Sequence, residues 1–264
     1  MWIATTYDRT PEAVVSGIPP RLGVMRARRV ALGLVFLAAG CAGSTALSSR
    51  DVALRLITGA TVSLRVEREP GTRRSASGVA IAVDRERART WIVTSRHLFE
   101  RADAGPVLVT AASRTRPLVA RVVGLSPDVD LALLEVGATD IPVASLKPAA
   151  QLGDEVWVVA FPRGRRATLV SGVISQLAQD GVVEGAAAMV DAPVSYGASG
   201  GGVFDRSTGQ LVGIVEGYRT ARVKVTGSPE RTVDIPFPGE TTVVSAAAIR
   251  RFLSTVDGVE RMLP

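Results

Sequence analysis

The sequence predicts an all-β protein with two sets of short strands. Its 264 residues are 47% hydrophobic and 21% charged, which is enough apolar material for a folded core. Only 5% of the residues are aromatic, while 26 glycines and 15 prolines are spread along the chain, so the core must be aliphatic and the turns numerous. No helical periodicity of useful length interrupts the apolar runs. This pattern favours an antiparallel barrel or sandwich over a parallel sheet with crossover helices.

The first forty residues have the pattern of a targeting segment. A basic stretch at residues 25–29 is followed by an apolar run at 30–37, small residues at 38–40, and Cys41, the only cysteine. This pattern resembles a bacterial lipoprotein signal peptide, although Ala38 stands where that family usually has leucine. The resemblance implies that residues 25–40 are removed and that Cys41 carries a lipid. Residues 1–24 precede Met25, the better start, and are interpreted as an untranslated extension.

A lipid on Cys41 implies a protein of the bacterial cell envelope, held by a membrane anchor on the periplasmic or extracellular face. The apolar run at residues 30–37 is shorter than the roughly 20 residues that span a bilayer as a helix. Ordinary secretion and a buried Cys41 are the alternatives. A lone cysteine also excludes an intramolecular disulfide and a cysteine-rich zinc site, and we expect no metal and no cofactor.

The first set of predicted strands follows a short tether, residues 41–55. Val62, Leu64 and Val66 alternate with polar residues, which is the period of a half-buried strand. Further strands are predicted at residues 78–83, 91–94, 107–110, 118–123 and 131–136, separated by Gly, Pro, Asp and Arg. We assign this set to a first barrel, at about residues 56–140.

The second set follows a link at residues 141–152, which has two prolines near Lys147. Its strands are predicted at residues 155–161, 168–175, 187–191, 201–204, 211–216, 222–226 and 241–244. This second barrel covers about residues 150–245. Ser245 can then cap a helix over residues 246–254, with Ile249 and Phe252 on one side, and the folded domain ends near residue 255.

Charge gives little sign of a nucleic-acid partner. The formal net charge is +6, but five of the arginines lie among the first forty residues, and the basic residues beyond them are scattered without interleaved aromatics. Arg163, Arg165 and Arg166 form one local cluster. We interpret it as a solvated loop, with attraction of acidic peptides or of a membrane surface as the alternative.

Residues 197–202, with the sequence GASGGG, carry the most specific local signal. A serine flanked by glycines can lie in a tight turn whose backbone N–H groups are not blocked by side chains. The N–H groups of Gly197 and Ser199 could then form an oxyanion hole while the Ser199 hydroxyl attacks a carbonyl. A turn of this kind without partners is usually just a hairpin.

A serine nucleophile needs a base, and His97 is the only histidine of the chain. It directly follows the apolar strand predicted at residues 91–94. The third group must be a carboxylate that orients the imidazole, and Asp130, at the start of the strand at 131–136, is our choice. Asp128 is the alternative, because it would point to the same side in an extended segment.

The order His97, Asp130, Ser199 resembles that of chymotrypsin-like serine proteases, and the local sequences at residues 94–98, 130–134 and 197–201 carry the resemblance. Details such as the Leu-Gly-Asp-Glu-Val at residues 152–156 look most like the bacterial Deg/HtrA-type protease domain. The resemblance implies two six-stranded antiparallel β-barrels with the trypsin-like fold. It also implies a serine endopeptidase that acts on polypeptides through an acyl-enzyme, in envelope protein processing or quality control.

Some features depart from the family. Ala198 replaces the aspartate that activates digestive trypsins. We expect no PDZ domain after the protease domain, so we do not carry the family's trimerisation over to this chain. Arg96 beside the histidine is expected to lower the pKa of His97 by like-charge repulsion. The rival functions are a catalytically latent binding or chaperone module on the same fold, a small-ester hydrolase, and a structural envelope lipoprotein.

The resemblance also suggests which residues line the specificity pocket. They are Pro193, Val194, Ile214, Val215 and Glu216. With no acid at position 193, we expect a small aliphatic residue before the scissile bond. If the Glu216 carboxylate turned into the pocket, a basic residue would be favoured instead.

Overall fold

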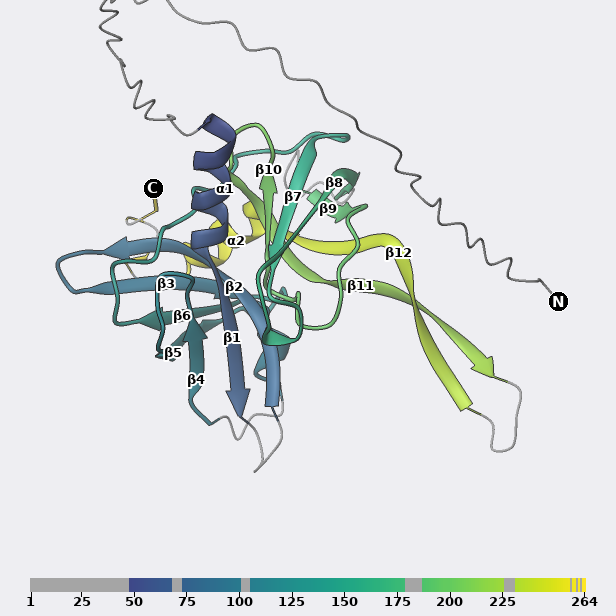
Figure 1. The fold of residues 1–264 in the computed structure, drawn as a ribbon, viewed down its shortest axis with the longest axis horizontal. Coiled ribbons are helices and arrows are strands. Elements are labelled where there is room, and N and C mark those ends of the chain that lie inside the picture. The colour runs from purple at the N-terminus through teal and green to yellow at the C-terminus, as the bar shows by residue number, and fades with distance from the viewer. Residues whose placement is uncertain are drawn as a thin grey trace, which may run out of the picture. The chain divides into compact units, whose positions relative to one another are not determined.

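The computed structural model describes residues 48–67, 73–100, 105–178, 187–225, 231–256, 258–259, 261 and 263–264. In this part of the chain, twelve strands form two closed barrels of six, in which all paired strands are antiparallel (Figure 1). The all-β, two-barrel prediction is therefore confirmed. The proposed signal peptide and Cys41 lie outside the described residues.

The first barrel has the strand order β1-β2-β3-β6-β5-β4. Its strands are β1 (Thr61–Glu67), β2 (Arg73–Asp84), β3 (Arg89–Thr94), β4 (Val107–Thr110), β5 (Leu118–Leu125) and β6 (Ala132–Val136). The alternation that predicted β1 is seen directly, because Val62, Leu64 and Val66 are all 0% exposed. They fill the barrel interior together with Ile92 and Leu134.

The second barrel has the order β10-β11-β12-β9-β8-β7. Its strands are β7 (Glu155–Ala160), β8 (Thr168–Leu177), β9 (Ala187–Val190), β10 (Gly202–Asp205), β11 (Leu211–Val225) and β12 (Arg231–Ser245). Buried aliphatic residues such as Val158, Ile174 and Val215 fill its interior.

Two strands predicted separately, at residues 211–216 and 222–226, are parts of the single strand β11. The sequence around Gly217 and Arg219 suggests that the strand ends there. The strand instead continues, and its register against β12 shifts between Val215 and Gly217 and between Tyr218 and Thr220. Beyond these shifts β11 pairs only with β12, from Thr220 with Pro236 to Val225 with Arg231. Figure 1 shows this two-stranded ribbon extending away from the barrel.

A third apolar core joins the two barrels. Ile81 and Leu133 of the first barrel pack in one cluster with Phe204 and Ile214 of the second, and all four are 0% exposed. Burial of this kind contributes about 1.5–3 kcal/mol for each large side chain. The shared core therefore fixes how the two barrels face each other, and with them the loops at their junction.

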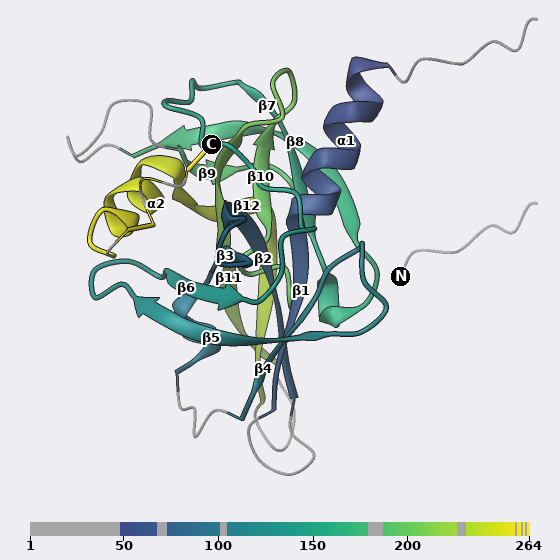
Figure 2. The same cartoon turned by 90° about the vertical axis from the view of Figure 1, so that its left-hand side faces the viewer.

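Two helices flank the barrels, and Figure 2 shows them on opposite sides. Helix α2 (Ala246–Leu253) was predicted, and the Ser245 hydroxyl caps it by accepting a hydrogen bond from Ala248 N at 3.2 Å. Helix α1 (Ser49–Ala60) was not predicted; it begins among the residues that we interpreted as a tether. Ser48 and Asp51 form a capping box at its start, and Ile57 is buried in the shared core. No helix among the described residues is long and apolar enough to cross a membrane.

The link between the barrels is held by Lys147. Its ammonium donates to Asp154 Oδ2 at 2.7 Å and to Asp205 Oδ2, and the Asp205 side chain is only 6% exposed. Burial by itself would raise the pKa of Asp205, but hydrogen bonds, first among them that from Lys147, hold this pKa well below its usual value. The lysine thus neutralises two carboxylates at the junction.

We expect Lys147→Ala to lower the free energy of unfolding by about 3 kcal/mol, because it leaves the buried Asp205 carboxylate without its cation. Urea denaturation followed by tryptophan fluorescence measures this change. The matched control is Arg206→Ala, whose ion pair with Glu155 is exposed, 43% and 65%, and should cost less than about 1 kcal/mol. Equal losses in the two variants would contradict the assigned role of Lys147.

Candidate active site

His97 and Asp130 are brought together by the pairing of β3 with β6. Thr94, the last residue of β3, pairs with Ala132 at the start of β6, so the segment after β3 lies against the segment before β6. His97 lies in the short 3-10 helix η1 (Arg96–Leu98), and its backbone N donates to Asp130 Oδ1 at 2.8 Å. Its ring atom Nδ1 is 2.6 Å from Asp130 Oδ2. The carboxylate therefore holds both the backbone and the ring of the histidine.

This contact defines the state of the imidazole. An ionised carboxylate can only accept, so Nδ1 is the nitrogen that donates, and in the neutral ring Nε2 is left as an acceptor. Burial by itself would raise the pKa of Asp130, but the hydrogen bonds from His97 outweigh it and lower this pKa. The same hydrogen bond raises the pKa of His97, against the opposing effect of burial. The ring is thus an oriented base whose protonated form is stabilised.

The prediction that Arg96 lowers the pKa of His97 is wrong. The Arg96 guanidinium donates to the carbonyls of Ser126 and Pro127, and the pKa of His97 is raised. The cation that opposes protonation of the ring is Arg74, and its effect is smaller than that of Asp130. Asp128 is exposed and makes no hydrogen bond with His97 among the described residues.

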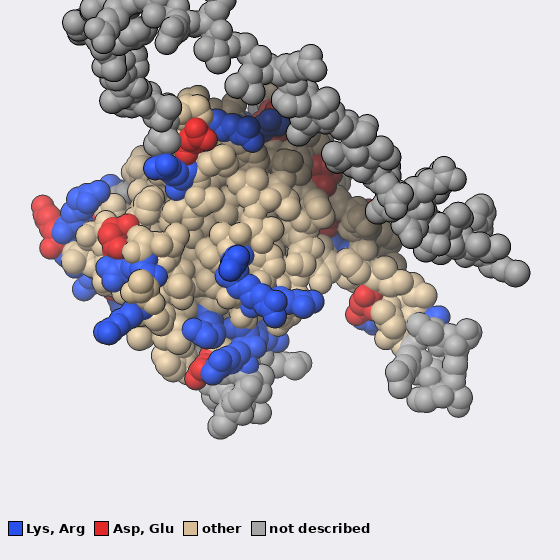
Figure 3. Space-filling view, in the orientation of Figure 1, with Lys and Arg blue, Asp and Glu red and all other residues tan. Residues whose placement is uncertain are grey.

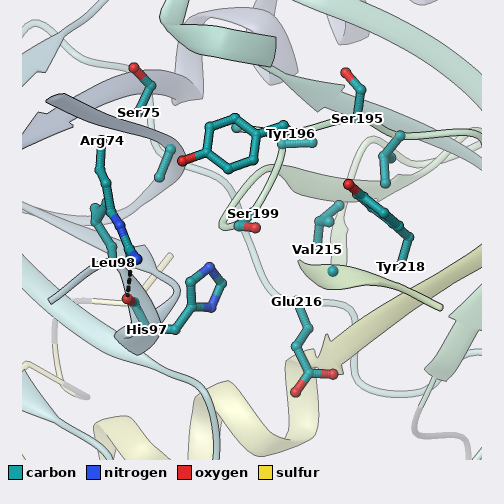
Figure 4. Close-up of a pocket in the computed structure, with 15 residues that line it drawn as sticks. Arg74, Ser75, His97, Leu98, Ser195, Tyr196, Ser199, Val215, Glu216 and Tyr218 are labelled. Atoms are coloured by element: carbon teal, nitrogen blue, oxygen red, sulfur yellow. Dashed lines mark hydrogen bonds between the residues drawn. The ribbon is translucent and has the colours of Figure 1, made fainter. Parts of the chain in front are cut away.

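Ser199 lies in the turn before β10 and lines a cavity of about 340 Å³ together with His97 (Figure 4). No hydrogen bond joins the Ser199 hydroxyl to the ring within the described part of the chain. Hydrogen bonds between catalytic groups are often long in a free enzyme and tighten when substrate binds. Because His97 and Ser199 line the same cavity, the ring can take the hydroxyl proton once a substrate brings the two groups into hydrogen-bond contact.

Two glycines with positive φ set the backbone of the turn at Ser199. Gly197 and Gly200 adopt φ values of 91° and 79°, which favour glycine, and a Cβ on Gly200 would come within 2.1 Å of the Ser77 carbonyl. The N–H groups of Ala198, Gly200 and Gly201 are used in backbone hydrogen bonds. Among the described residues, the N–H groups of Gly197 and Ser199 have no such acceptor.

The carbonyl that could block this turn is held away from it. Tyr196 O accepts a hydrogen bond from Arg163 N at 2.9 Å. Arg163 lies in the 3-10 segment η2 (Pro162–Gly164) with φ of 55°, an unusual value for a residue other than glycine. The peptide between Tyr196 and Gly197 is therefore oriented with its oxygen toward η2, which leaves its N–H available to a ligand in the cavity.

Ser77, which the sequence analysis did not propose as a site residue, anchors the turn. It is 0% exposed, and its N–H donates to Ser199 O at 2.8 Å. Its hydroxyl donates to Gly197 O at 3.0 Å and accepts from Phe161 N at 2.8 Å. Ser77 is 120 residues from Gly197 in the chain, so only the packing of the two barrels reveals this link. No pattern around Ser77 could have predicted it.

The residues predicted for the specificity pocket fall into three places. Val194, Val215 and Glu216 line the cavity that contains Ser199. Pro193 lines a neighbouring cavity of about 210 Å³, which Val194 also borders. Ile214 is 0% exposed in the core shared by the barrels and lines neither cavity. In Figure 4 the Glu216 carboxylate points away from Ser199. No group of three metal-binding side chains is found among the residues that the structure describes.

The chain was compared with known proteins. A family model described as a trypsin-like peptidase domain matches residues 76–214. A probable periplasmic serine endoprotease DegP-like from Pseudomonas fluorescens is 33% identical over 156 residues, which are 58% of this chain and 31% of that protein. The periplasmic serine endoprotease DegP of Salmonella typhimurium is 31% identical over 146 residues, 53% of this chain and 29% of that protein. The match spans about a third of the length of these relatives.

Solved structures show the same fold. The serine endoprotease from Yersinia pestis superposes with a TM-score of 0.60 at 22% identity, over 82% of this chain and 68% of that one. A protease from M. tuberculosis, crystallised in its active form, gives a TM-score of 0.59 at 21% identity, over 78% of this chain and 84% of that one. Taken together with the family model, which covers more than half of the sequence, these comparisons show that the chain belongs to the trypsin-like peptidase family, with bacterial DegP-like proteins among its relatives.

Proposed function

We propose that this protein is a serine endopeptidase in which Ser199 is the nucleophile, His97 the general base and Asp130 the residue that orients the base. The observation that carries the proposal is that His97, which lines the same cavity as Ser199, has its ring held by Asp130 through a 2.6 Å contact. The available N–H groups of Gly197 and Ser199 complete the arrangement. An acyl transfer needs these three elements together: nucleophile, oriented base and oxyanion donors.

The chemistry follows from these positions. The Ser199 oxygen attacks the carbonyl carbon while its proton passes to His97 Nε2, and the carbonyl oxygen becomes an oxyanion that accepts hydrogen bonds from Gly197 and Ser199 N–H. His97 then gives the proton to the departing amine, and the C–N bond breaks to leave an acyl-enzyme. Water, deprotonated by the same nitrogen, attacks the ester, and Ser199 regains its proton when the acid leaves.

The open edge of β11 supports a polypeptide substrate rather than a small ester. The pairing of β10 with β11 ends at Ile214, whereas β12 continues to pair with β11 along Val215, Gly217 and Tyr218. Among the described residues, no strand pairs with the second backbone edge of residues 216–218, and all three line the cavity with Ser199. An extended polypeptide can bind such an edge as an added strand, through main-chain hydrogen bonds.

The setting that we propose is the bacterial cell envelope. Relatives of this chain are named periplasmic endoproteases, and the sequence before Cys41 resembles a bacterial lipoprotein signal peptide. We therefore propose a lipid-anchored protease of envelope protein processing or quality control. The rival, a latent binding module, would need a blocked oxyanion turn, and the hydrogen bond from Arg163 N to Tyr196 O argues against it.

Labelling of the folded protein with a fluorophosphonate probe tests the proposal. We expect one adduct, located on Ser199 by mass spectrometry of the digested protein, and cleavage of casein by the same preparation. Labelling without cleavage of casein, but with turnover of small esters, would favour an ester hydrolase. A folded protein that takes up no probe would contradict the proposed enzyme and favour the binding module.

We expect Ser77→Ala to lower kcat about tenfold or more while leaving KM nearly unchanged. The substitution leaves Phe161 N and Gly197 O without their buried partner, which costs about 1–3 kcal/mol and loosens the oxyanion turn. Affinity for a peptide boronic acid, which mimics the tetrahedral intermediate, should fall by the same factor. Ser63→Ala is the matched control: Ser63 pairs with Ser77 across β1 and β2, but among the described residues its hydroxyl makes no hydrogen bond with the turn. A rise in KM alone would show that Ser77 does not act through the turn.

A further inference from the structure

One wall of the active-site cavity continues into a surface rich in arginine. Five residues form this arginine patch: Arg65 on β1, Arg74 on β2, Arg163 in η2, and Arg165 and Arg166 directly after η2. Figure 3 shows basic side chains gathered on the face that includes the end of β1 and the start of β2. The sequence analysis found only the last three members, as a local cluster.

The packing of η2 onto the first barrel brings the members together. A Cβ on Gly164 would come within 2.7 Å of Ser75 Oγ and 3.8 Å of Ser63 Oγ, so η2 lies directly over the outer face of β1 and β2. Arg65 is the register partner of Ser75 on that same face. Arg163 and Arg165, the neighbours of Gly164, are therefore held beside Arg65. Arg74, the residue before Ser75 on β2, points to the other side of the strand, toward His97, and lines the cavity itself (Figure 4).

The patch carries five positive charges. Within the described residues, none of its five guanidinium groups forms an ion pair with a carboxylate, whereas neighbouring Arg73 pairs with Glu67. Arg74 donates to the His97 carbonyl at 3.1 Å, which places a cation next to the candidate base. Charges of one sign on the wall of a cleft raise the local concentration of ligands of the opposite sign.

The arginine patch lies on one side of the place that the scissile bond of a substrate would occupy beside Ser199. In Figure 4, Val215, Glu216 and Tyr218 of β11 lie on one side of Ser199, and Arg74 and Ser75 of β2 lie on the other. A polypeptide that pairs with the open edge of β11 on one side of its scissile bond leaves the cavity on the other side, over Arg74. Its next residues then pass along the arginine patch.

We propose that the arginine patch binds carboxylates of the substrate. These carboxylates lie in the substrate segment on the other side of the scissile bond from β11, so the protein prefers polypeptides that are acidic in that segment. This inference rests on the proposed endopeptidase function. Guanidinium groups suit the task because they bind carboxylates with two parallel hydrogen bonds. Because Arg163, Arg165 and Arg166 are exposed, their effect should appear mainly in substrate capture and should weaken with salt.

Two peptides that differ only in this segment test the inference. Both carry the same residues on the β11 side of the scissile bond. On the other side, the second to fourth residues after the bond are all glutamate in one peptide and all glutamine in the other. We expect kcat/KM to be about tenfold higher for the glutamate peptide at low ionic strength, mainly through a lower KM. The ratio should fall toward one in about 0.5 M salt, where the screening length is roughly 4 Å.

Variants connect the preference to the patch. The double substitution Arg165→Gln with Arg166→Gln should reduce the glutamate-to-glutamine ratio at least threefold. The ratio is the informative quantity, because a general loss of activity cancels from it. Arg55→Gln is the matched control: Arg55 is an exposed arginine of α1, at the opposite end of β1 from Arg65, and its loss should leave the ratio as it is.

The outcomes separate the two proposals. Equal cleavage of both peptides, with fluorophosphonate labelling of Ser199 intact, overturns the patch inference and leaves the endopeptidase standing. Equal cleavage together with binding to phosphatidylglycerol vesicles that the double variant loses would identify the patch as a membrane contact and also overturns it. A folded protein with neither labelling nor cleavage overturns both.

Discussion

Ser199→Ala and His97→Ala should each lower kcat by about a millionfold, the largest effects that we expect from any substitution in this chain. Without Ser199 no acyl-enzyme can form, and without His97 no other histidine is available to take the hydroxyl proton. Since the three groups act as one unit, the double variant should be hardly slower than either single one. The loss should be entirely in kcat, because neither side chain contributes to the β11 edge.

Fluorophosphonate labelling and casein cleavage measure this loss, and urea denaturation of each variant shows that the fold is kept. Ser171→Ala, at an exposed serine on β8, is the matched control and should label like the unmodified protein. Labelling that survives Ser199→Ala would place the nucleophile elsewhere. Labelling that survives His97→Ala at a normal rate would remove the histidine from the mechanism.

Asp130→Asn has the second-largest expected effect, a fall in kcat of about ten thousandfold near neutral pH. The asparagine amide can donate to Nδ1, which would place the proton of the neutral ring on Nε2 and leave no acceptor for the Ser199 proton. Asp128→Asn is the matched control, two residues away and exposed, and should keep nearly full activity. If instead Asp128→Asn caused the large loss, the assignment of the orienting carboxylate would be wrong.

The pH dependence gives an independent test of the same pair. His97 must be neutral to act as a base, and the hydrogen bond to Asp130 raises the pKa of His97 by stabilising the protonated ring. In the unmodified protein, kcat/KM should therefore rise with pH through a midpoint above the ordinary value for histidine. In Asp130→Asn the midpoint should move to lower pH, because the negative charge is gone. A midpoint that stays in place in this variant would show that Asp130 does not control the base.

The secondary structure could be predicted well because it depends on local patterns. Alternation of apolar and polar residues identified β1, and short apolar runs bounded by turn residues identified most of the other strands. Helix α2 followed from its cap at Ser245. Prediction failed where an irregular backbone continues a strand, as in β11, and at α1, whose short apolar face becomes meaningful only against the shared core.

The sequence by itself determined the two-barrel fold class and the candidates His97, Asp130 and Ser199, because a single histidine and a glycine-flanked serine leave few alternatives. Only the tertiary structure placed His97 and Asp130 in contact, linked Ser77 to the oxyanion turn and packed η2 over the face of β1 and β2 that carries Arg65. The physical reason is that hydrogen bonds and charge fields act through space. Residues that are far apart in the chain meet only when the core between the two barrels fixes their relative position.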